Sequence, residues 1–167
     1  MKIDNFTIQA ERPGDDDAIE ALHEASFGPG RFARAASLLR EGVAHDRRLS
    51  FVATAGIDLI ASVRLTPILI GDRPAVLLGP LAVVAGWKGR GAGKSLMRTA
   101  LAAAREAGHA VVLLVGDEPY YGQFGFVLLP PPYRITLPAP ADPARVLVCP
   151  LVEGALSGLA GMARRVG

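Results

Sequence analysis

The stretch LAVVAGWKGRGAGKSLM, residues 81–97, joins a strand-like apolar run to the start of a helix through a glycine-rich turn. Glycine leaves backbone N–H groups open to close approach, and the N-terminus of a helix favours an anion through its unpaired donors and its dipole. Positive side chains alternate with the glycines. The pattern therefore predicts a turn that binds a phosphate group. The residues that form it are Lys88, Gly89, Arg90, Gly91, Ala92, Gly93, Lys94 and Ser95.

The turn ends in Gly-Lys-Ser, as the Walker A loop of nucleotide-binding proteins does, but the spacing of that motif is not met. Walker A places a further glycine five residues before Gly93, and Lys88 stands there. The dinucleotide fingerprint G-x-G-x-x-G fails too, because a start at Gly89 requires glycine at the position of Lys94. The glycines and the cations between them, at the start of a helix, still favour the binding of an anion.

Composition excludes several classes of protein. A length of 167 residues is typical of one domain, so residues 1–167 are expected to form a single domain with its own core. The net charge of +2 comes with scattered arginines, whereas nucleic-acid binding usually needs a dense basic stripe. Cys149 is the one cysteine, which excludes an internal disulfide. The chain has no signal-peptide pattern and no membrane-spanning run, so we expect a cytoplasmic protein without nucleic-acid or membrane partners.

Hydrophobic periodicity and breaker residues predict the order of the secondary-structure elements. The runs at 49–55, 58–71 and 75–84 are separated by short turns and indicate an antiparallel meander. The run at 110–116 is apolar throughout, as in a strand buried on both faces, and it follows a helix at 92–107, which indicates a βαβ unit. The other expected elements are strands at 6–11, 124–129 and 145–151, helices at 15–27 and 31–42, a short turn or helix from 118, an irregular proline-rich loop at 130–143 and a surface tail at 152–167.

These elements predict an α/β fold with a mixed, mostly antiparallel and twisted sheet flanked by helices, in the order β-αα-βββ-α-β-α-β-β. One strand is interrupted, because Gly79-Pro80 lies within the run at 75–84. Proline cannot donate a hydrogen bond to a neighbouring strand, so this dipeptide marks an edge, a bulge or the place where pairing stops.

Two segments together resemble the GNAT (Gcn5-related) N-acetyltransferases. The family's acetyl-CoA loop is an apolar strand followed by [Arg/Gln]-x-x-Gly-x-[Gly/Ala] and a helix, and residues 88–93 are similar to it, with Lys88 in place of Arg or Gln. The segment YYGQFGF, residues 120–126, resembles the family's Y-x-x-x-G-F, with Tyr121 as its tyrosine. The element order is similar over most of the chain, which is identified as a bacterial-type member with a GNAT-like fold.

The resemblance implies acetyl-CoA, or coenzyme A, as the cosubstrate, without a metal. In the family, backbone N–H groups of the turn bind the CoA pyrophosphate, and this role carries over to residues 88–95. The pantetheine arm pairs like an extra strand with the strand before the turn, here along Leu81, Ala82 and Val83. The strand at 110–116 is then splayed away, and Gly79-Pro80 suits the bulge that opens the gap.

The resemblance also implies the chemistry. A neutral amine attacks the acetyl thioester directly, a backbone N–H just after Gly79-Pro80 polarises the carbonyl, and coenzyme A leaves as a thiolate. Tyr121 is then the general acid that protonates this thiolate. Two alternatives stay open: Tyr121 is a core aromatic residue beside Phe124 and Phe126, or Tyr120 is the residue that points at the sulfur.

The general base is not identified by the sequence. Some family members carry a glutamate on the strand before the turn, whereas the run at 75–84 has no ionisable group. Many members carry an asparagine after the next strand; here Gly116-Asp117 follows, and Asp117 is expected to cap a helix. Trp87 and Cys149 are interpreted as packing residues. The candidates for the base are Glu24, Glu118, His23 and a chain of water molecules.

Two other functions remain as alternatives: a CoA-binding sensor without catalysis, because no base is evident, and a P-loop nucleotide binder. The acceptor would be a small-molecule amine or an amine of a peptide or protein, bounded by residues 15–42, 71–74 and 130–143. If Phe27, Arg31 and Arg34 face it, the arginines indicate a carboxylate on the acceptor, and the alternative is a solvated helix face. A homodimer is compatible with the family and with the prevalence of two-fold dimers.

Overall fold

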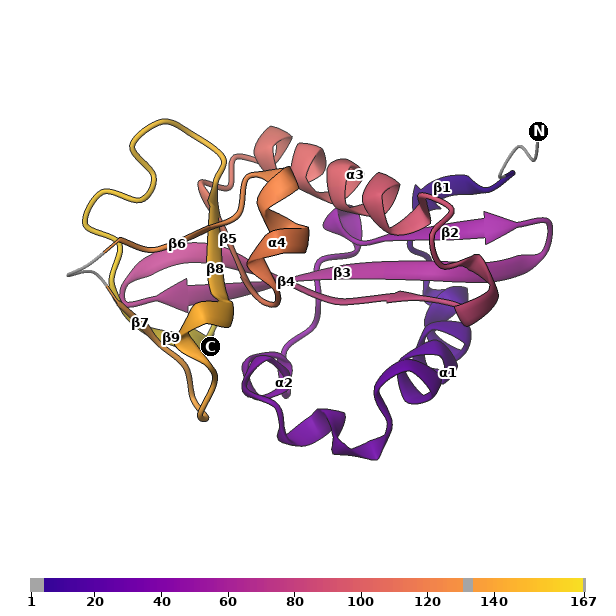
Figure 1. Cartoon of the computed structure of the whole chain (residues 1–167), viewed down its shortest axis with the longest axis horizontal. Coiled ribbons are helices and arrows are strands. Elements are labelled where there is room, and N and C mark those ends of the chain that lie inside the picture. The colour runs from indigo at the N-terminus through magenta and orange to yellow at the C-terminus, as the bar shows by residue number, and fades with distance from the viewer. Residues whose placement is uncertain (1–4, 131–133, 167) are drawn as a thin grey trace.

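The computed structural model describes residues 5–130 and 134–166, and Figure 1 shows a mixed sheet with helices on both faces. The strands are β1 (Thr7–Ala10), β2 (Phe51–Ala55), β3 (Asp58–Ile70), β4 (Arg73–Val83), β5 (Val111–Val115), β6 (Val127–Leu128), β7 (Ile135–Thr136), β8 (Val146–Pro150) and β9 (Gly161–Arg165). The helices are α1 (Asp16–Phe27), α2 (Ala35–Arg40), α3 (Ala92–Glu106) and α4 (Glu118–Tyr121).

The main sheet has the order β1-β2-β3-β4-β5-β8-β6, and β9 adds to β3. Neighbours in this order are antiparallel except β4 and β5, which are parallel and are joined through α3. The predicted meander and the predicted βαβ unit are therefore both present. The prediction of an α/β fold with a mostly antiparallel mixed sheet is confirmed.

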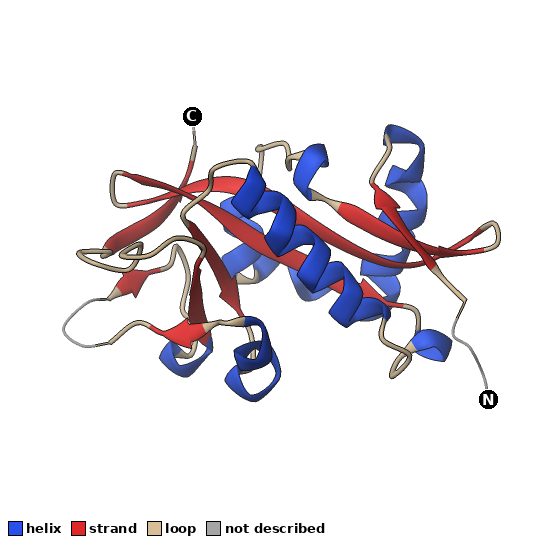
Figure 2. Ribbon diagram, turned by 90° about the horizontal axis from the view of Figure 1, so that it is seen from above, coloured by secondary structure: helices blue, strands red, loops and turns tan. Residues whose placement is uncertain are grey.

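Helix α3 covers one face of the sheet, while α1 and α2 lie on the opposite face (Figure 1). Seen from the α3 side, the long helix crosses the central strands (Figure 2). Helical spacing places its apolar residues on one stripe, and these residues are buried in the core shared with β3, β4 and β5. They are Leu96, Met97, Ala100, Leu101 and Ala104.

The bulge predicted at Gly79-Pro80 is present in β4. Leu65 pairs with Leu78 and Val63 with Leu81, so β4 takes three steps where β3 takes two. Gly79 has a φ of +137°, a conformation that side-chain-bearing residues rarely adopt. The pairing of β4 with β5 covers only Val76 and Leu77 among the described residues. Beyond the bulge the two parallel strands therefore separate, as expected, and 81–83 pair with β3 on one side only.

The tail expected on the surface, in which no strand was predicted, contributes β9, which corrects the predicted element order. Residues 163–165 pair with 68–70 of β3, at the end of β3 that β2 does not reach. This edge would otherwise leave backbone donors and acceptors unpaired. Arg165 Nη1 also donates to the backbone oxygen of Glu41 at 2.9 Å, which ties β9 to the end of α2.

Three further boundaries differ from the sequence expectation. The helix expected at 31–42 is a 3-10 turn at Pro29–Ala33 followed by the short α2. The strand expected at 124–129 is reduced to β6, because a 3-10 turn precedes it and Gly125 has a φ of +97°. The proline-rich loop contains β7, and its Pro131 and Pro132 lie outside the described residues.

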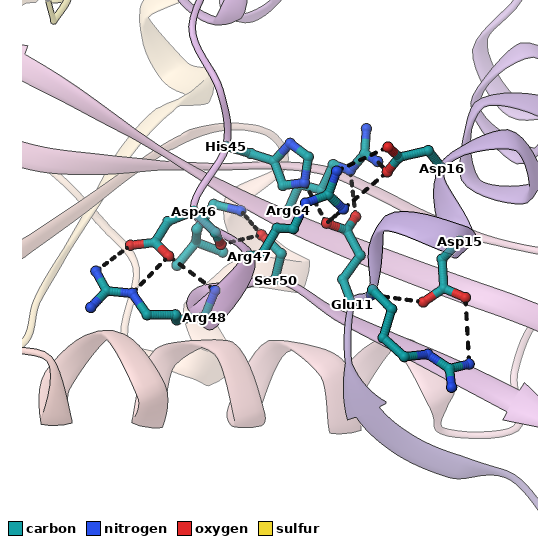
Figure 3. A network of polar contacts seen from close by, with 11 residues as sticks. Glu11, Asp15, Asp16, His45, Asp46, Arg47, Arg48, Ser50 and Arg64 are labelled. Carbon is teal, nitrogen blue, oxygen red and sulfur yellow. Dashed lines mark hydrogen bonds and ion pairs between the residues drawn. The ribbon is translucent and has the colours of Figure 1, made fainter.

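A cluster of ion pairs fixes the start of α1 to the sheet (Figure 3). The Glu11 side chain is fully buried and accepts hydrogen bonds from His45, from Arg64 Nε at 2.6 Å and from Arg47 Nη1 at 3.1 Å. Asp16 accepts two hydrogen bonds from Arg47, at 3.0 and 2.9 Å, and one from Arg64 at 3.2 Å. Burial alone would raise the pKa of Glu11, but its hydrogen bonds to His45 and Arg64 outweigh burial and lower it.

Candidate active site

Two adjoining cavities lie beside the gap between β4 and β5. The larger has a volume of about 1360 Å³ and is lined by parts of α1, α2, β4, β5 and the loop before β8. The smaller has a volume of about 680 Å³ and lies between β4 beyond the bulge and the start of α3. Both are lined by Phe27, Leu81, Tyr120 and Tyr121, so they meet at these four residues.

The smaller cavity brings together most of the residues that the sequence assigned to cofactor binding. It is also bounded by Ser26, Phe27 and Trp87 and by the two tyrosines. Arg90 and Ser95 are not among its lining residues; the guanidinium of Arg90 stacks on the Trp87 ring, 4.7 Å from its centroid. The assigned residues that line the cavity are Leu81, Ala82, Val83, Lys88, Gly89, Gly91, Ala92, Gly93 and Lys94.

The turn has a left-handed backbone at two positions, and glycine occupies both. Gly89 has a φ of +80°, and Gly91, which precedes the first residue of α3, has a φ of +90°. A Cβ at either position would meet no described atom within 4 Å, so the space above both glycines is open to a ligand.

The backbone donors of the turn are suited to binding an anion. The N–H groups of Ala92, Gly93 and Lys94 belong to the first turn of α3, and within the described residues they have no acceptor. Two assigned residues differ in this respect. The N–H of Lys88 donates to Ala85 at 3.3 Å, and the N–H of Ser95 donates to Gly91 at 3.0 Å. At Lys88 only the side chain is therefore available to a ligand, and at Ser95 the backbone N–H is not available.

The two candidate tyrosines occupy different places. The Tyr121 ring packs against Gly116 at the end of β5 and meets Phe126 edge-on at 6.1 Å between centroids. The Tyr120 hydroxyl lies beside the glycine turn, 3.4 Å from where a Cβ of Gly93 would be. Burial raises the pKa of Tyr121, and the nearby Tyr120 and Asp117 raise it further, so this phenol is protonated at neutral pH.

The larger cavity is lined by the three residues that the sequence placed conditionally at the acceptor, Phe27, Arg31 and Arg34. It also contains arginines and carboxylates that the sequence interpretation missed. Helical spacing could have found two of them, because Glu20 lies two turns before Phe27 on α1 and Arg40 lies one turn after Ala36 on α2. The missed charged residues are Glu20, Arg40, Glu41, Asp117, Asp142 and Arg145.

Asp117 does not cap the following helix, contrary to expectation. It occupies the N-cap position of α4, but its side chain makes no capping hydrogen bond. Instead, its Oδ1 accepts a hydrogen bond from Arg145 Nε at 3.1 Å. The aspartate therefore links the end of β5 to the start of β8 at the rim of the larger cavity.

None of the three side chains proposed as the base lines either cavity. Glu24 and Glu118 are exposed on α1 and α4. His23 is buried, and burial lowers its pKa to about 4, so its ring is neutral at physiological pH. Its Nε2 has no hydrogen-bond partner among the described residues. The geometry therefore supports none of these residues as a group that contacts an acceptor.

Other residues behave as packing residues. Cys149 is buried, its Sγ lies 3.5 Å from where a Cβ of Gly125 would be, and burial raises the pKa of the thiol. Trp87 packs against the core beside α3. Within residues 5–130 and 134–166, no group of three or more His, Cys, Asp or Glu side chains is arranged to hold a metal ion. No helix in the same ranges has the length and apolar character needed to cross a bilayer.

The sheet opens between two parallel strands, next to a helix-entry turn with free N–H groups. This arrangement is typical of acyl-CoA-dependent transferases. Comparison with known proteins supports this. The profile of the acetyltransferase (GNAT) family matches residues 17–126. An uncharacterised N-acetyltransferase of Escherichia coli, YhbS, is 30% identical over 160 residues, which span 93% of each chain. The chain belongs to the acetyltransferase (GNAT) family.

Solved structures agree with this assignment. The crystal structure of E. coli YhbS in complex with CoA has a TM-score of 0.80 and 30% identity, covering 95% of this chain and 88% of YhbS. A GNAT acetyltransferase of Brucella melitensis in complex with acetyl-CoA has a TM-score of 0.59 and 32% identity, covering 74% of this chain and 83% of its own. The predicted family, the predicted enzyme class and the predicted cosubstrate are confirmed.

Proposed function

We propose that the protein transfers the acetyl group of acetyl-CoA to a primary amine by direct attack. The observation that carries this proposal is the meeting of the two cavities at Leu81 and Tyr121, beside the gap between β4 and β5. One cavity has a donor-rich turn suited to a pyrophosphate, and the other has room and charged groups suited to an acceptor. The reacting atoms would come together where the cavities join.

The cofactor would lie along the smaller cavity. Its pyrophosphate would accept hydrogen bonds from the N–H groups of the glycine turn, with Lys88 and Lys94 adding positive charge. Its pantetheine arm would follow 81–83, where β4 has parted from β5 and is paired on one side. The relatives solved with CoA and acetyl-CoA support this reading.

In the reaction, the amine nitrogen forms a bond to the thioester carbonyl carbon, and the carbon–sulfur bond breaks in the tetrahedral intermediate. A backbone N–H just after the bulge would stabilise the oxyanion. Tyr121 would donate its proton to the departing thiolate and recover it from solvent. Support for Tyr121 over Tyr120 comes from its position at the end of β5, whereas the Tyr120 hydroxyl lies beside the glycine turn.

The amine must lose a proton to attack. Glu20 and Asp117 line the larger cavity, but each is held by an arginine, Arg31 at 2.7 Å and Arg145 at 3.1 Å. Asp142 also lines the cavity but accepts a hydrogen bond from the Ala144 N–H at 3.0 Å, and Glu41 is exposed at the end of α2. We propose that a chain of water molecules through this cavity carries the proton. The net products are the N-acetylated amine and free coenzyme A.

Two measurements test the proposal. Calorimetric titration with acetyl-CoA and with ATP should show binding of acetyl-CoA alone; binding of ATP would favour the P-loop alternative. Release of free thiol should then be followed with acetyl-CoA and a panel of primary amines. Turnover with at least one class of amine is expected. A CoA-binding sensor would be favoured instead if acetyl-CoA bound tightly and no amine of the panel raised thiol release above the rate of acetyl-CoA hydrolysis.

A further inference from the structure

One arginine of the larger cavity differs from the others in its surroundings. Arg40 is the last residue of α2 and lines this cavity but not the smaller one. Its Nη1 lies 3.6 Å from where a Cβ of Gly79 would be, so the guanidinium sits against the bulge of β4. The arginine head therefore lies at the edge of the gap, beside the bulge.

The remaining arginines of the cavity already have partners. Arg31 donates to Glu20 and to the backbone oxygen of Gly28, each at 2.7 Å. Arg34 stacks on the Phe27 ring, 5.7 Å from its centroid. Arg145 is paired with Asp117.

The guanidinium of Arg40, by contrast, has no hydrogen bond or ion pair among residues 5–130 and 134–166. The charge that acts on it is another cation, Arg64, which is itself paired with Glu11 and Asp16. Burial, and to a smaller extent Arg64, lower the pKa of Arg40 to about 10, so the group still carries its charge at neutral pH. A partly buried cation is costly unless an anion pairs with it. The cavity thus holds a partly buried positive charge that no described residue pairs with.

We infer that the acceptor amine carries a carboxylate and that Arg40 binds this carboxylate. The inference rests on the proposed function, because it places the acceptor in the larger cavity. Arg40 does not line the cavity assigned to CoA, so the anion belongs to the acceptor. A guanidinium presents two parallel N–H donors that match a carboxylate. Amino acids, their ω-amino analogues and short peptides with a free C-terminus have this chemistry.

The test uses amines in matched pairs that differ only at the acid group: glycine and glycinamide, β-alanine and β-alaninamide, and glycylglycine and its amide. The wild-type protein should acetylate the acid of at least one pair with the higher kcat/KM. Arg40→Met should lower that acid-to-amide ratio by about tenfold or more, as expected for a lost charge-assisted hydrogen bond. The amide should be acetylated at nearly the same rate as by wild type.

Two further variants make this result specific. Arg40→Lys keeps the charge and should retain part of the preference. Arg34→Met removes a cation from the same cavity and should leave the acid-to-amide ratio unchanged; an equal loss would show that overall charge, not Arg40, sets the preference. Arg40→Met should also unfold at a temperature no lower than wild type, because it removes an uncompensated partly buried charge. Equal loss of rate on both members of each pair would overturn the inference and assign Arg40 to the reaction centre.

A binding measurement separates this inference from the proposed reaction. Thermal shift is measured with CoA present and with N-acetylglycine or N-acetylglycinamide added. If N-acetylglycine stabilises the wild-type protein but not Arg40→Met, the result supports the carboxylate site even if no amine is turned over. Turnover of amines without any acid preference, together with equal shifts from acid and amide, leaves the acetyltransferase reaction standing and removes the role of Arg40.

Discussion

The ring of Tyr121 packs against Gly116 so closely that a Cβ at position 116 would lie 2.4 Å from the ring atom Cε2. Gly116 follows β5 directly, and Tyr121 ends α4, so this contact sets the side chain where the two cavities meet. The absence of a side chain at 116 is thus a geometric requirement for the position of the tyrosine.

Gly116→Ala should therefore lower kcat for amine acetylation by about tenfold or more, because the added methyl group displaces Tyr121, the proposed general acid. Acetyl-CoA affinity should change much less, since the glycine turn is untouched. Gly122→Ala is the matched control: its φ of −58° suits alanine, and a Cβ there meets no described atom within 4 Å. Equal effects of the two substitutions would contradict the positioning role of Gly116.

Tyr121→Phe should reduce kcat by about a hundredfold, in the range typical of a lost general acid, with acetyl-CoA affinity nearly unchanged. Steady-state thiol release and calorimetry measure the two quantities. Tyr120→Phe is the comparison, because its hydroxyl lies beside Gly93 instead. A large loss of kcat in Tyr120→Phe, with none in Tyr121→Phe, would exchange the roles of the two residues.

Gly91→Glu should abolish measurable acetyl-CoA binding. The side chain would add a negative charge where free N–H groups await a pyrophosphate, and the φ of +90° would strain any residue with a Cβ. Gly86→Glu adds the same charge nearby, at a glycine with open surroundings that does not line the cavity. This control should still bind acetyl-CoA in calorimetry. Retained affinity in Gly91→Glu would refute the assignment of the turn.

Glu11→Gln should lower the free energy of unfolding at pH 7 by about 3 kcal/mol, because it removes a buried carboxylate that accepts hydrogen bonds from Arg47 and Arg64. The pKa of Glu11 is lowered from its ordinary value of 4.5. Its contribution is therefore fully present above pH 4.5 and is lost as the pH falls through the folded pKa. Chemical denaturation at pH 7 and pH 3 measures both effects. Asp72→Asn, at an exposed ion pair with Arg164, should change little.

The lowered pKa of the buried His23 predicts a second pH dependence of the free energy of unfolding. Its pKa is lowered from 6.5 to about 4 in the folded protein, mainly by burial. Between these values the unfolded chain binds the proton and the folded chain does not, so stability rises with pH across this window, by up to about 3 kcal/mol. His23→Gln should remove most of this slope in denaturation curves measured from pH 4 to 7. His109→Gln, at a histidine outside α1, should retain it.

The cofactor side of the site could be predicted from the sequence because it is local. Residues 81–95 run consecutively from strand to helix, and glycine spacing alone specifies a turn with free donors. The exceptions are Lys88, whose N–H is used by the 3-10 turn at Ala85–Trp87, and Ser95, whose N–H donates to Gly91.

The acceptor side could not be predicted in the same way. Arg40, Gly79 and Asp117 come from three separate elements, and nothing in their spacing indicates that they line one cavity. The contact of Arg40 with the bulge depends on how α2 lies against β4. Similarly, β9 pairs with the part of β3 that extends beyond β2, and the sequence does not indicate that 161–165 is the segment that pairs there.

Through the hydrogen bond from Arg165 to the backbone of Glu41, β9 helps to hold α2, which lines the cavity proposed for the acceptor. No residue of β9 lines that cavity. Helix α2 has six residues, too few to be stable alone, so its placement depends on such tethers. The glycine turn proposed to bind acetyl-CoA belongs to another part of the chain. If the acceptor binds in the larger cavity as proposed, substitutions in β9 would change which amine is accepted without changing the cofactor site, and relatives could diverge in acceptor by this route.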